Sequence, residues 1–253
     1  MREFLVLLRK EWLEQWRTYR LLVVGVVLAI FGLLSPLTAK YTPELIKLVP
    51  NGEAIARLIP PPTTMDAVAQ YVKNISQFGV ILALLLTMGA VAQEKDKGTA
   101  AMMLVKPLPR VTFLAAKFAA LALMFAVSIA VAGLACYYYT WLMFEALDVS
   151  RWLMLNSLLL LFVLVYVALT LLCSVAAKSQ TAAGGFAFGL LLILGLAGSI
   201  PSWGEYMPGQ LLVWGGSLVA GNADAYWGTL GVSLGIIIAA FVGAWRVFER
   251  QEL

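Results

Sequence analysis

Long apolar runs without a single Lys, Arg, Asp or Glu alternate with short charged segments along the chain. A helix needs about 20 apolar residues to cross the roughly 30 Å hydrocarbon core of a bilayer. Six runs meet this requirement, over residues 21–39, 76–92, 118–139, 153–177, 181–200 and 228–245. We therefore expect an all-α membrane protein whose residues 21–253 form one domain of six transmembrane helices.

Residues 1–20 predict an amphipathic helix and not a span, because apolar and charged side chains alternate there with helical spacing. The apolar face carries Phe4, Leu5, Leu8, Trp12, Trp16 and Tyr19. We expect this helix to lie in the inner headgroup layer with its tryptophans at the interface. It serves there either as a membrane anchor or as a surface that also contacts a cytoplasmic partner.

A seventh apolar run, over residues 207–223, is interrupted by helix-breaking residues. They are Pro208, Gly209, Gly215, Gly216 and Gly221. The pieces between them are too short to cross, which predicts short re-entrant or surface-lying helices on the outer side, before the last span. The alternative, a seventh span, would move Arg246 and Arg250 to the outer side.

The positive charges predict the orientation of the chain. The segments on the side of the two termini hold 13 of the 18 Lys and Arg residues, whereas the acidic residues divide equally between the two sides. Cytoplasmic segments of membrane proteins carry an excess of Lys and Arg. Both termini are therefore expected in the cytoplasm.

Composition excludes several other classes of protein. With 62% hydrophobic and 13% charged residues, the chain lacks the charged surface that a soluble globular protein needs. It contains no His and only two Cys, so neither His-dependent hydrolysis nor a Cys or His metal site is expected. The net charge of +4 follows the membrane rule and does not indicate nucleic-acid binding. We predict no catalytic, cofactor-binding or metal-binding residue.

The loop between the second and third spans predicts a short cytoplasmic helix. Thr99 is a suitable N-cap, and the helix must end before Pro107, which disfavours helical geometry in the preceding residue. Its apolar residues Met102, Met103 and Leu104 have no core of their own to enter, and flexible methionines suit an adaptable docking surface. The alternative is an ordinary charged loop packed on the bilayer.

The ordered set Glu94, Gly98, Thr99, Leu104, Pro107, Arg110 and Lys117 resembles the motif of the membrane subunits of ABC-2 type ABC transporters, which are mostly exporters. The order of helices and the basic C-terminal end resemble that family too. The resemblance implies that this loop is the coupling helix, which docks into the ATP-binding subunit. The residues assigned to coupling are Glu94, Gly98, Thr99, Met102, Met103, Leu104, Pro107 and Arg110.

The chain has no Gly-x4-Gly-Lys-Ser/Thr phosphate loop, so ATP and Mg would bind to another subunit. The resemblance implies a permease in a bacterial cell membrane, working by alternating access with two ATP-binding subunits. A second permease, identical or a paralogue, would face it. Membrane lipid is the remaining partner.

The predicted spans contain no ionisable residue, which argues against ion coupling and favours a hydrophobic or amphipathic substrate. A peptide is the first candidate, and a drug or a lipid comes next. Two other classes stay open: an ion-coupled or passive carrier or channel without an ATPase, and an assembly protein that does not transport. Purification with a soluble ATP-binding protein separates the permease from the first of these.

Four glycines within the last two predicted spans fit the small-xxx-small spacing of close helix packing. They are Gly185, Gly189, Gly231 and Gly235. Gly231 and Gly235 also match a hydrolase Gly-x-Ser-x-Gly pattern around Ser233, but no His is present to activate that serine. Cys136 and Cys173 belong to opposite ends of their spans, so we predict no disulfide between them.

Overall fold

A computed structural model describes residues 2–48, 50, 53, 60–96, 109–222 and 225–251. Every regular element in these ranges is a helix. The helices are α1 (Arg2–Arg17), α2 (Arg20–Lys47), α4 (Thr64–Thr87), α5 (Ala92–Asp96), α7 (Arg110–Met143), α8 (Val149–Ala176), α9 (Gln180–Gly198), α10 (Pro201–Gly204), α11 (Gln210–Val219) and α12 (Trp227–Glu249). The helix predicted to begin at Thr99 lies outside the described residues.

Within the described residues, six helical segments are long and apolar enough to cross a membrane: α2, α4 with α5, α7, α8, α9 and α12. The predicted all-α fold with six membrane-spanning helices is thereby confirmed. Most of these helices extend beyond the charge-free runs of the sequence. For example, α4 begins 12 residues before Ser76, where the Asp66 carboxylate accepts a 2.7 Å hydrogen bond from the Thr63 backbone N–H.

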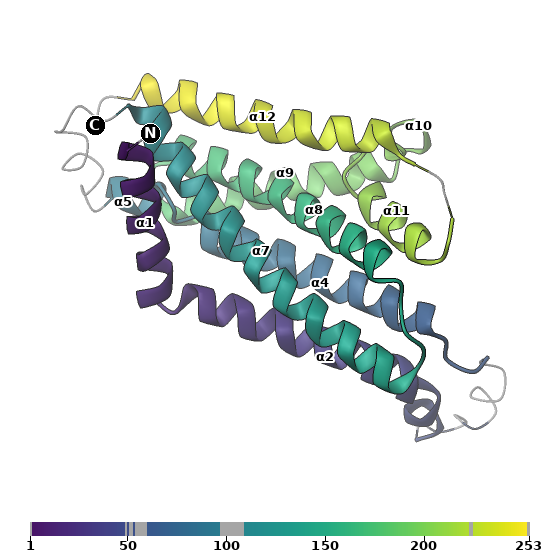
Figure 1. Ribbon diagram of the computed structural model, residues 1–253. Helices are drawn as coiled ribbons and strands as arrows, with labels where there is room; N and C mark the ends of the chain where they lie inside the picture. The colour runs from purple at the N-terminus through teal and green to yellow at the C-terminus, as the bar shows by residue number, and fades with distance from the viewer. Residues whose placement is uncertain are drawn as a thin grey trace.

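The long helices lie side by side in one bundle (Figure 1). Helix α1 runs across one end of this bundle, where both chain termini also lie, and α10 and α11 lie at the opposite end. Within the bundle, α7 packs along α2, and α8 packs against α4, α11 and α12. The elements that the sequence predicts on the cytoplasmic side, α1, α5 and the two termini, thus lie at one end of the molecule.

The glycines at which the described helices approach one another closely are not the four that the sequence pattern predicted. A Cβ built on Gly185, Gly189, Gly231 or Gly235 would meet no atom within 4 Å, so these glycines are not in close contact with another helix in the part of the chain described. A Cβ on Gly32 of α2 would instead collide with the backbone of Ala132 on α7. Among the long described helices, α2 and α7 therefore approach closely, backbone to backbone, at Gly32.

Polar side chains inside the bundle hydrogen-bond to neighbouring helices. The Tyr71 hydroxyl donates to Asn156 Oδ1 at 2.6 Å, which joins α4 to α8, and the Asn74 amide donates to Ser35 Oγ at 3.0 Å, which joins α4 to α2. Trp152 Nε1 donates to the Gly133 carbonyl oxygen at 3.3 Å. These bonds satisfy groups that would otherwise be costly to bury in an apolar environment.

The described N-terminal helix turns a different face to the protein than its apolar stripe suggested. Glu11 and Gln15 are buried, while Trp16 and Tyr19 are 66% and 67% exposed. Tyr19 lies beyond the end of α1, in a left-handed turn with φ of 58°. Phe4, Leu8 and Trp12 are half-buried. Part of the apolar stripe therefore packs on the bundle and part is exposed. The side of α1 that packs on the bundle also includes the Glu11 carboxylate.

The apolar run over residues 207–223 contains α11, a helix of 10 residues, which at about 1.5 Å per residue is too short to cross a bilayer. The re-entrant or surface-lying position of this helix relative to the membrane stays a prediction.

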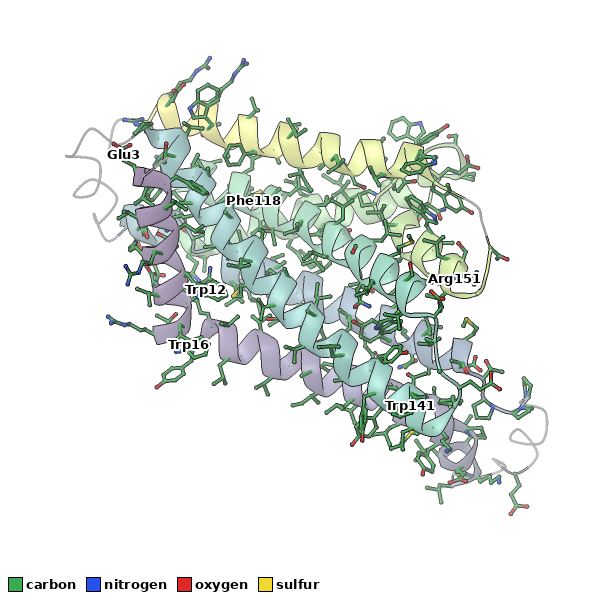
Figure 2. All side chains as sticks on the ribbon, viewed as in Figure 1. Glu3, Trp12, Trp16, Phe118, Trp141 and Arg151 are labelled. Carbon is green, nitrogen blue, oxygen red and sulfur yellow. The ribbon has the colours of Figure 1, made fainter. Side chains whose placement is uncertain are left out.

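Exposed tryptophans lie at both ends of the bundle. Trp16 lies at the end that carries the termini, and Trp141 and Arg151 lie at the other (Figure 2). Exposed tryptophans at both ends are typical of the two membrane interfaces. Cys136 and Cys173 are both free and buried.

Candidate functional site

The predicted coupling segment can be located only by its two flanks. Gly98, Thr99, Met102, Met103, Leu104 and Pro107 lie outside the described residues. Glu94, in α5, precedes this segment, and Arg110, which opens α7, follows it. Each flank makes specific contacts with the ends of other helices, and these contacts define the candidate site.

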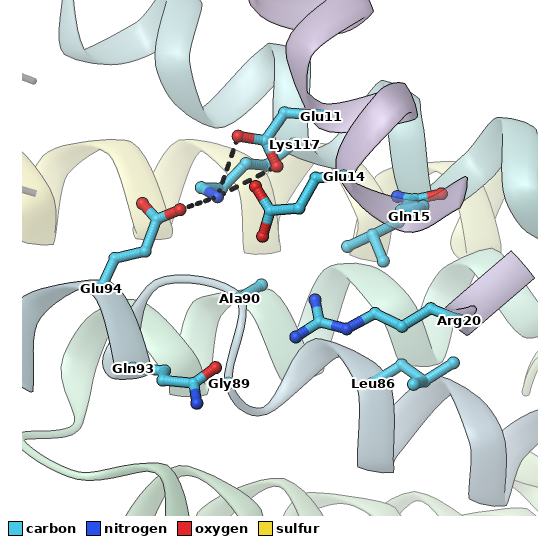
Figure 3. Close-up of a pocket in the computed structure, with 11 residues that line it drawn as sticks. Glu11, Glu14, Gln15, Arg20, Leu86, Gly89, Ala90, Gln93, Glu94 and Lys117 are labelled. Atoms are coloured by element: carbon cyan, nitrogen blue, oxygen red, sulfur yellow. Dashed lines mark hydrogen bonds and ion pairs between the residues drawn. The ribbon is translucent and has the colours of Figure 1, made fainter. Parts of the chain in front are cut away.

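Lys117 of α7 is the centre of a buried ion network. Its side chain is 4% exposed, and its Nζ atom lies 3.1 Å from both carboxylate oxygens of Glu11 and 2.7 Å from Glu94 Oε1. Figure 3 shows the ammonium group between the two carboxylates. Because Glu11 comes from α1 and Glu94 from α5, a single lysine joins three elements at the end of the bundle that carries the termini.

A second lysine extends the network. Lys10 Nζ lies 3.0 Å from Glu11, 3.4 Å from Glu14 and 3.8 Å from Glu94. The adjoining cavity holds only about 30 Å³, and Arg20 is among the residues that line it. The three carboxylates are thus matched by nearby cations, which makes their burial tolerable.

This charge balance also bears on metal binding. Carboxylate oxygens of Glu11, Glu14 and Glu94 lie within 4.8 Å of one another, a spacing that could hold a cation. The ammonium groups of Lys10 and Lys117 already contact these oxygens, however, and would repel a metal ion. The geometry therefore favours an ion-pair junction between helices over a metal site.

The network shifts the pKa values of Glu11 and Lys10 on α1. Burial raises the pKa of Glu11, but the ammonium groups of Lys117 and Lys10 outweigh it and hold the pKa below 4.5. For Lys10, burial lowers the pKa, but the carboxylates of Glu11, Glu94 and Glu14 outweigh it and hold the pKa above 10.5. Both shifts favour the charged forms on which α1 docking depends.

We predict that this stabilisation is lost at acidic pH. Because the pKa of Glu11 is depressed by folding, its contribution is present above about pH 4.5 and disappears as the pH falls through the lower folded value. The difference in unfolding midpoint between the wild type and Glu11→Gln should therefore be largest near neutrality and shrink below pH 4.5. A difference that stays constant down to pH 3 would contradict this assignment.

Ser174 of α8 holds the bend between α4 and α5. Its Oγ atom accepts hydrogen bonds from the backbone N–H groups of Val91 at 3.0 Å and Ala92 at 3.1 Å, and it donates to the Met88 carbonyl oxygen at 2.8 Å. Ser174, Val91 and Ala92 are fully buried, so these two N–H groups have no ready access to water. This hydroxyl therefore positions the short helix that carries Glu94.

Replacing Ser174 with alanine should destabilise the protein by about 1–3 kcal/mol, because two buried N–H groups would lose their acceptor. The unfolding midpoint measures the effect, and hydrogen exchange at Ala92 should localise it. Ser157→Ala is the matched control, since the exposed Ser157 hydroxyl bonds only to the Leu153 carbonyl of its own helix. Equal effects of the two substitutions would contradict the positioning role of Ser174.

The loop flanks are also tied to the C-terminal ends of α8 and α12. Lys95 Nζ donates to the carbonyl oxygens of Val175 at 2.6 Å and Ala177 at 2.9 Å. Arg110 Nη1 donates to three backbone carbonyl oxygens at the end of α12, those of Phe248, Glu249 and Gln251. Cations suit the unsatisfied carbonyls of helix C-termini. Movement of either flank would therefore reach α8 and α12 as well as α1.

Sequence reasoning located part of this site. It named Glu94, Arg110 and Lys117 through the family motif, but it missed Glu11, Ser174 and the contacts of Lys95. Glu11 carried a usable signal, because a carboxylate three residues after Leu8 interrupts the apolar stripe of α1. Ser174 had none, since a single serine near a helix end is common.

Known proteins are similar to this chain along its length. The family model described as "ABC-2 family transporter protein" matches residues 5–209. The uncharacterized transmembrane protein YxlG of Bacillus subtilis (strain 168) is 29% identical over 259 residues, which cover 100% of this chain and 99% of the relative. Since the family match extends over most of a chain with six membrane-spanning helices, the protein belongs to the ABC-2 family and is the multi-pass membrane component of an ABC transporter.

Proposed function

We propose that this chain is the permease subunit of an ATP-driven exporter, in which a separate cytoplasmic subunit hydrolyses ATP. Members of its family typically work with an ATP-binding subunit. The observation that carries the proposal is the Lys117 network, which ties Glu94, at the edge of the predicted coupling segment, to α7 and α1. A push on that segment would be delivered to a membrane-spanning helix through buried ion pairs.

The proposed mechanism is alternating access. Closure of two ATP-binding subunits, which would hold the ATP and Mg, moves the coupling segment and switches the spans between inward-open and outward-open arrangements. Both termini face the cytoplasm in this proposal, and a second permease copy or paralogue completes the pathway. The clustering of α1, both loop flanks and both termini at one end of the bundle supports a shared cytoplasmic docking face (Figure 1).

The proposed cargo is hydrophobic or amphipathic, with a peptide as the first candidate and a drug or a lipid next. The charge-free central runs of the six spans support this class, because an ion-coupled carrier needs ionisable groups or a broken helix near mid-membrane.

The decisive experiment combines purification with ATPase measurement. The tagged chain should co-purify with a soluble ATP-binding protein, and substrate should stimulate the ATPase of the complex. Glu94→Ala combined with Met103→Asp should leave the chain in the membrane yet abolish that stimulation. Glu205→Ala, an exposed carboxylate just after α10, is the control and should leave stimulation unchanged. Unchanged stimulation in the double variant, or full-speed transport with every ATPase absent, would overturn the proposal.

A further inference from the structure

One face of α4 is polar where it should be apolar if it contacted only lipid. Lys73 and Gln77 are exposed on this face, one helical turn apart. Among the described residues, neither the Lys73 ammonium nor the Gln77 amide has a hydrogen-bond or ion-pair partner. The polar groups are therefore available to a ligand.

The depth of these residues follows from the packing of α4 on α8. We place the bilayer centre at the middle of α8, between Phe162 and Val163, and a Cβ on Gly79 of α4 would lie 3.0 Å from Val163. At about 1.5 Å per residue, Gln77 lies about 3 Å and Lys73 about 9 Å from that level along α4. Both values fall within the roughly 15 Å half-thickness of a hydrocarbon core. A polar side chain facing lipid at such depth is costly, so this face is expected to bind something else.

A groove adjoins the polar pair on its inner side. It has a volume of about 460 Å³ and lies between α4, α8 and α9, with an almost wholly apolar lining. Ser76 and Gln77 stand at one end, Ile81 and Leu85 continue along α4, and Phe188 closes it from α9. Its size lies in the range of small-molecule sites, roughly 300–1,000 Å³.

A second hollow continues from Lys73 toward the end of the bundle opposite the termini. It has a volume of about 340 Å³, and its polar lining is Thr42 of α2 with Gln70, Lys73 and Asp66 of α4. The Asp66 carboxylate, one turn from Gln70, accepts two hydrogen bonds from Thr63, so Lys73 is the cation that an anionic head would contact. Along one helix face, an apolar groove is thus followed by a cation and then by a more polar hollow. This order matches a molecule with an apolar tail and a negatively charged head.

The geometry points to a binding site for a single-chain anionic amphiphile, with its tail in the groove beside Ile81 and its head at Lys73. From Leu85 to Lys73 the helix rises about 18 Å. One acyl chain spans about half of the roughly 30 Å core, or about 15 Å, so the tail fits this length. The inference rests on the proposed function in that it names the class of cargo.

The test is a binding titration on the purified full chain in nanodiscs of neutral phosphatidylcholine. The probes are lysophosphatidylglycerol, which is anionic, and lysophosphatidylcholine, which has the same tail and no net charge. We expect about tenfold tighter binding of the anionic probe, because the choline ammonium of the neutral probe offsets the attraction between its phosphate and Lys73. Free glycerophosphate should not compete, since it lacks the tail.

Three variants localise the site. Lys73→Met should abolish the preference for the anionic probe, while Lys47→Met, which removes an exposed lysine at the end of α2 outside both hollows, should leave it intact. Ile81→Trp should fill the groove and weaken both probes equally. Equal binding of the two probes, equal loss in Lys47→Met, or displacement by glycerophosphate would overturn the inference.

A cysteine at position 77 distinguishes a ligand site from a contact between copies. The natural Cys136 and Cys173 are buried, so Gln77→Cys should be the thiol that reacts with an uncharged, membrane-permeant maleimide, and the anionic amphiphile should protect it. Spontaneous disulfide formation between two copies at position 77 would overturn the site. No assay here needs an ATPase, so a missing ATP-binding partner would refute the proposed function and leave amphiphile binding to be judged separately.

Discussion

Replacing Lys117 with methionine is expected to destabilise the protein by about 3–5 kcal/mol, because it leaves the carboxylates of Glu11 and Glu94 buried without their main partner. A loss of this size is a large fraction of the stability of an ordinary protein. The variant should therefore show a strongly lowered unfolding midpoint in detergent and reduced abundance in the membrane. Hydrogen exchange should increase first in α1, which the network holds against α7.

Two controls separate loss of the ion network from loss of packing. Lys178→Met removes an exposed lysine between α8 and α9 and should change stability by no more than about 0.5 kcal/mol. The triple variant Glu11→Leu, Lys117→Met and Glu94→Leu should regain much of the stability, because no buried charge is left without its partner. A Lys117→Met protein as stable as the wild type would show that the network does not hold α1.

Replacing Gly32 with valine is expected to prevent α2 and α7 from packing as they do. The added Cβ alone would overlap the carbonyl group of Ala132, so the two helix backbones would have to separate. Overpacking usually costs about 1–3 kcal/mol, and a backbone obstacle places this substitution at or above the upper end. The yield of folded protein and its unfolding midpoint measure the loss.

Gly25→Ala is the matched control on the same helix. Its Cβ would lie 3.9 Å from Ser128 Oγ, an ordinary contact, so little destabilisation is expected. Ala132→Gly should not rescue Gly32→Val, because the collision is with the backbone of residue 132 and not with its methyl group. Rescue by that second substitution, or equal effects at the two glycines, would contradict the proposed contact.

The transmembrane helices could be predicted because their cause is local. A charge-free apolar run must be buried in lipid, and an isolated segment in lipid must be helical to satisfy its own backbone. The ends of these helices were harder to predict. Helix α4 begins at Thr64, and its first turns carry Asp66 and Lys73, so a hydropathy pattern assigns them to a loop. The family motif indicated Glu94 and Lys117, but it carried no information on which residue each would contact.

The amino-acid sequence by itself determined that this protein lies in a membrane, which runs form its membrane-spanning helices, and the family to which the chain belongs. Each of these depends on runs of neighbouring residues. Only the tertiary structure decided that Glu11 faces Lys117, that Ser174 holds the bend before Glu94, and that Gly32 is a close contact of the bundle. These features join residues 82 to 106 positions apart and depend on which of several similar helix faces pair. The pairing of helices is a property of the whole bundle, because an apolar stripe fits many neighbours and only their combined packing selects one.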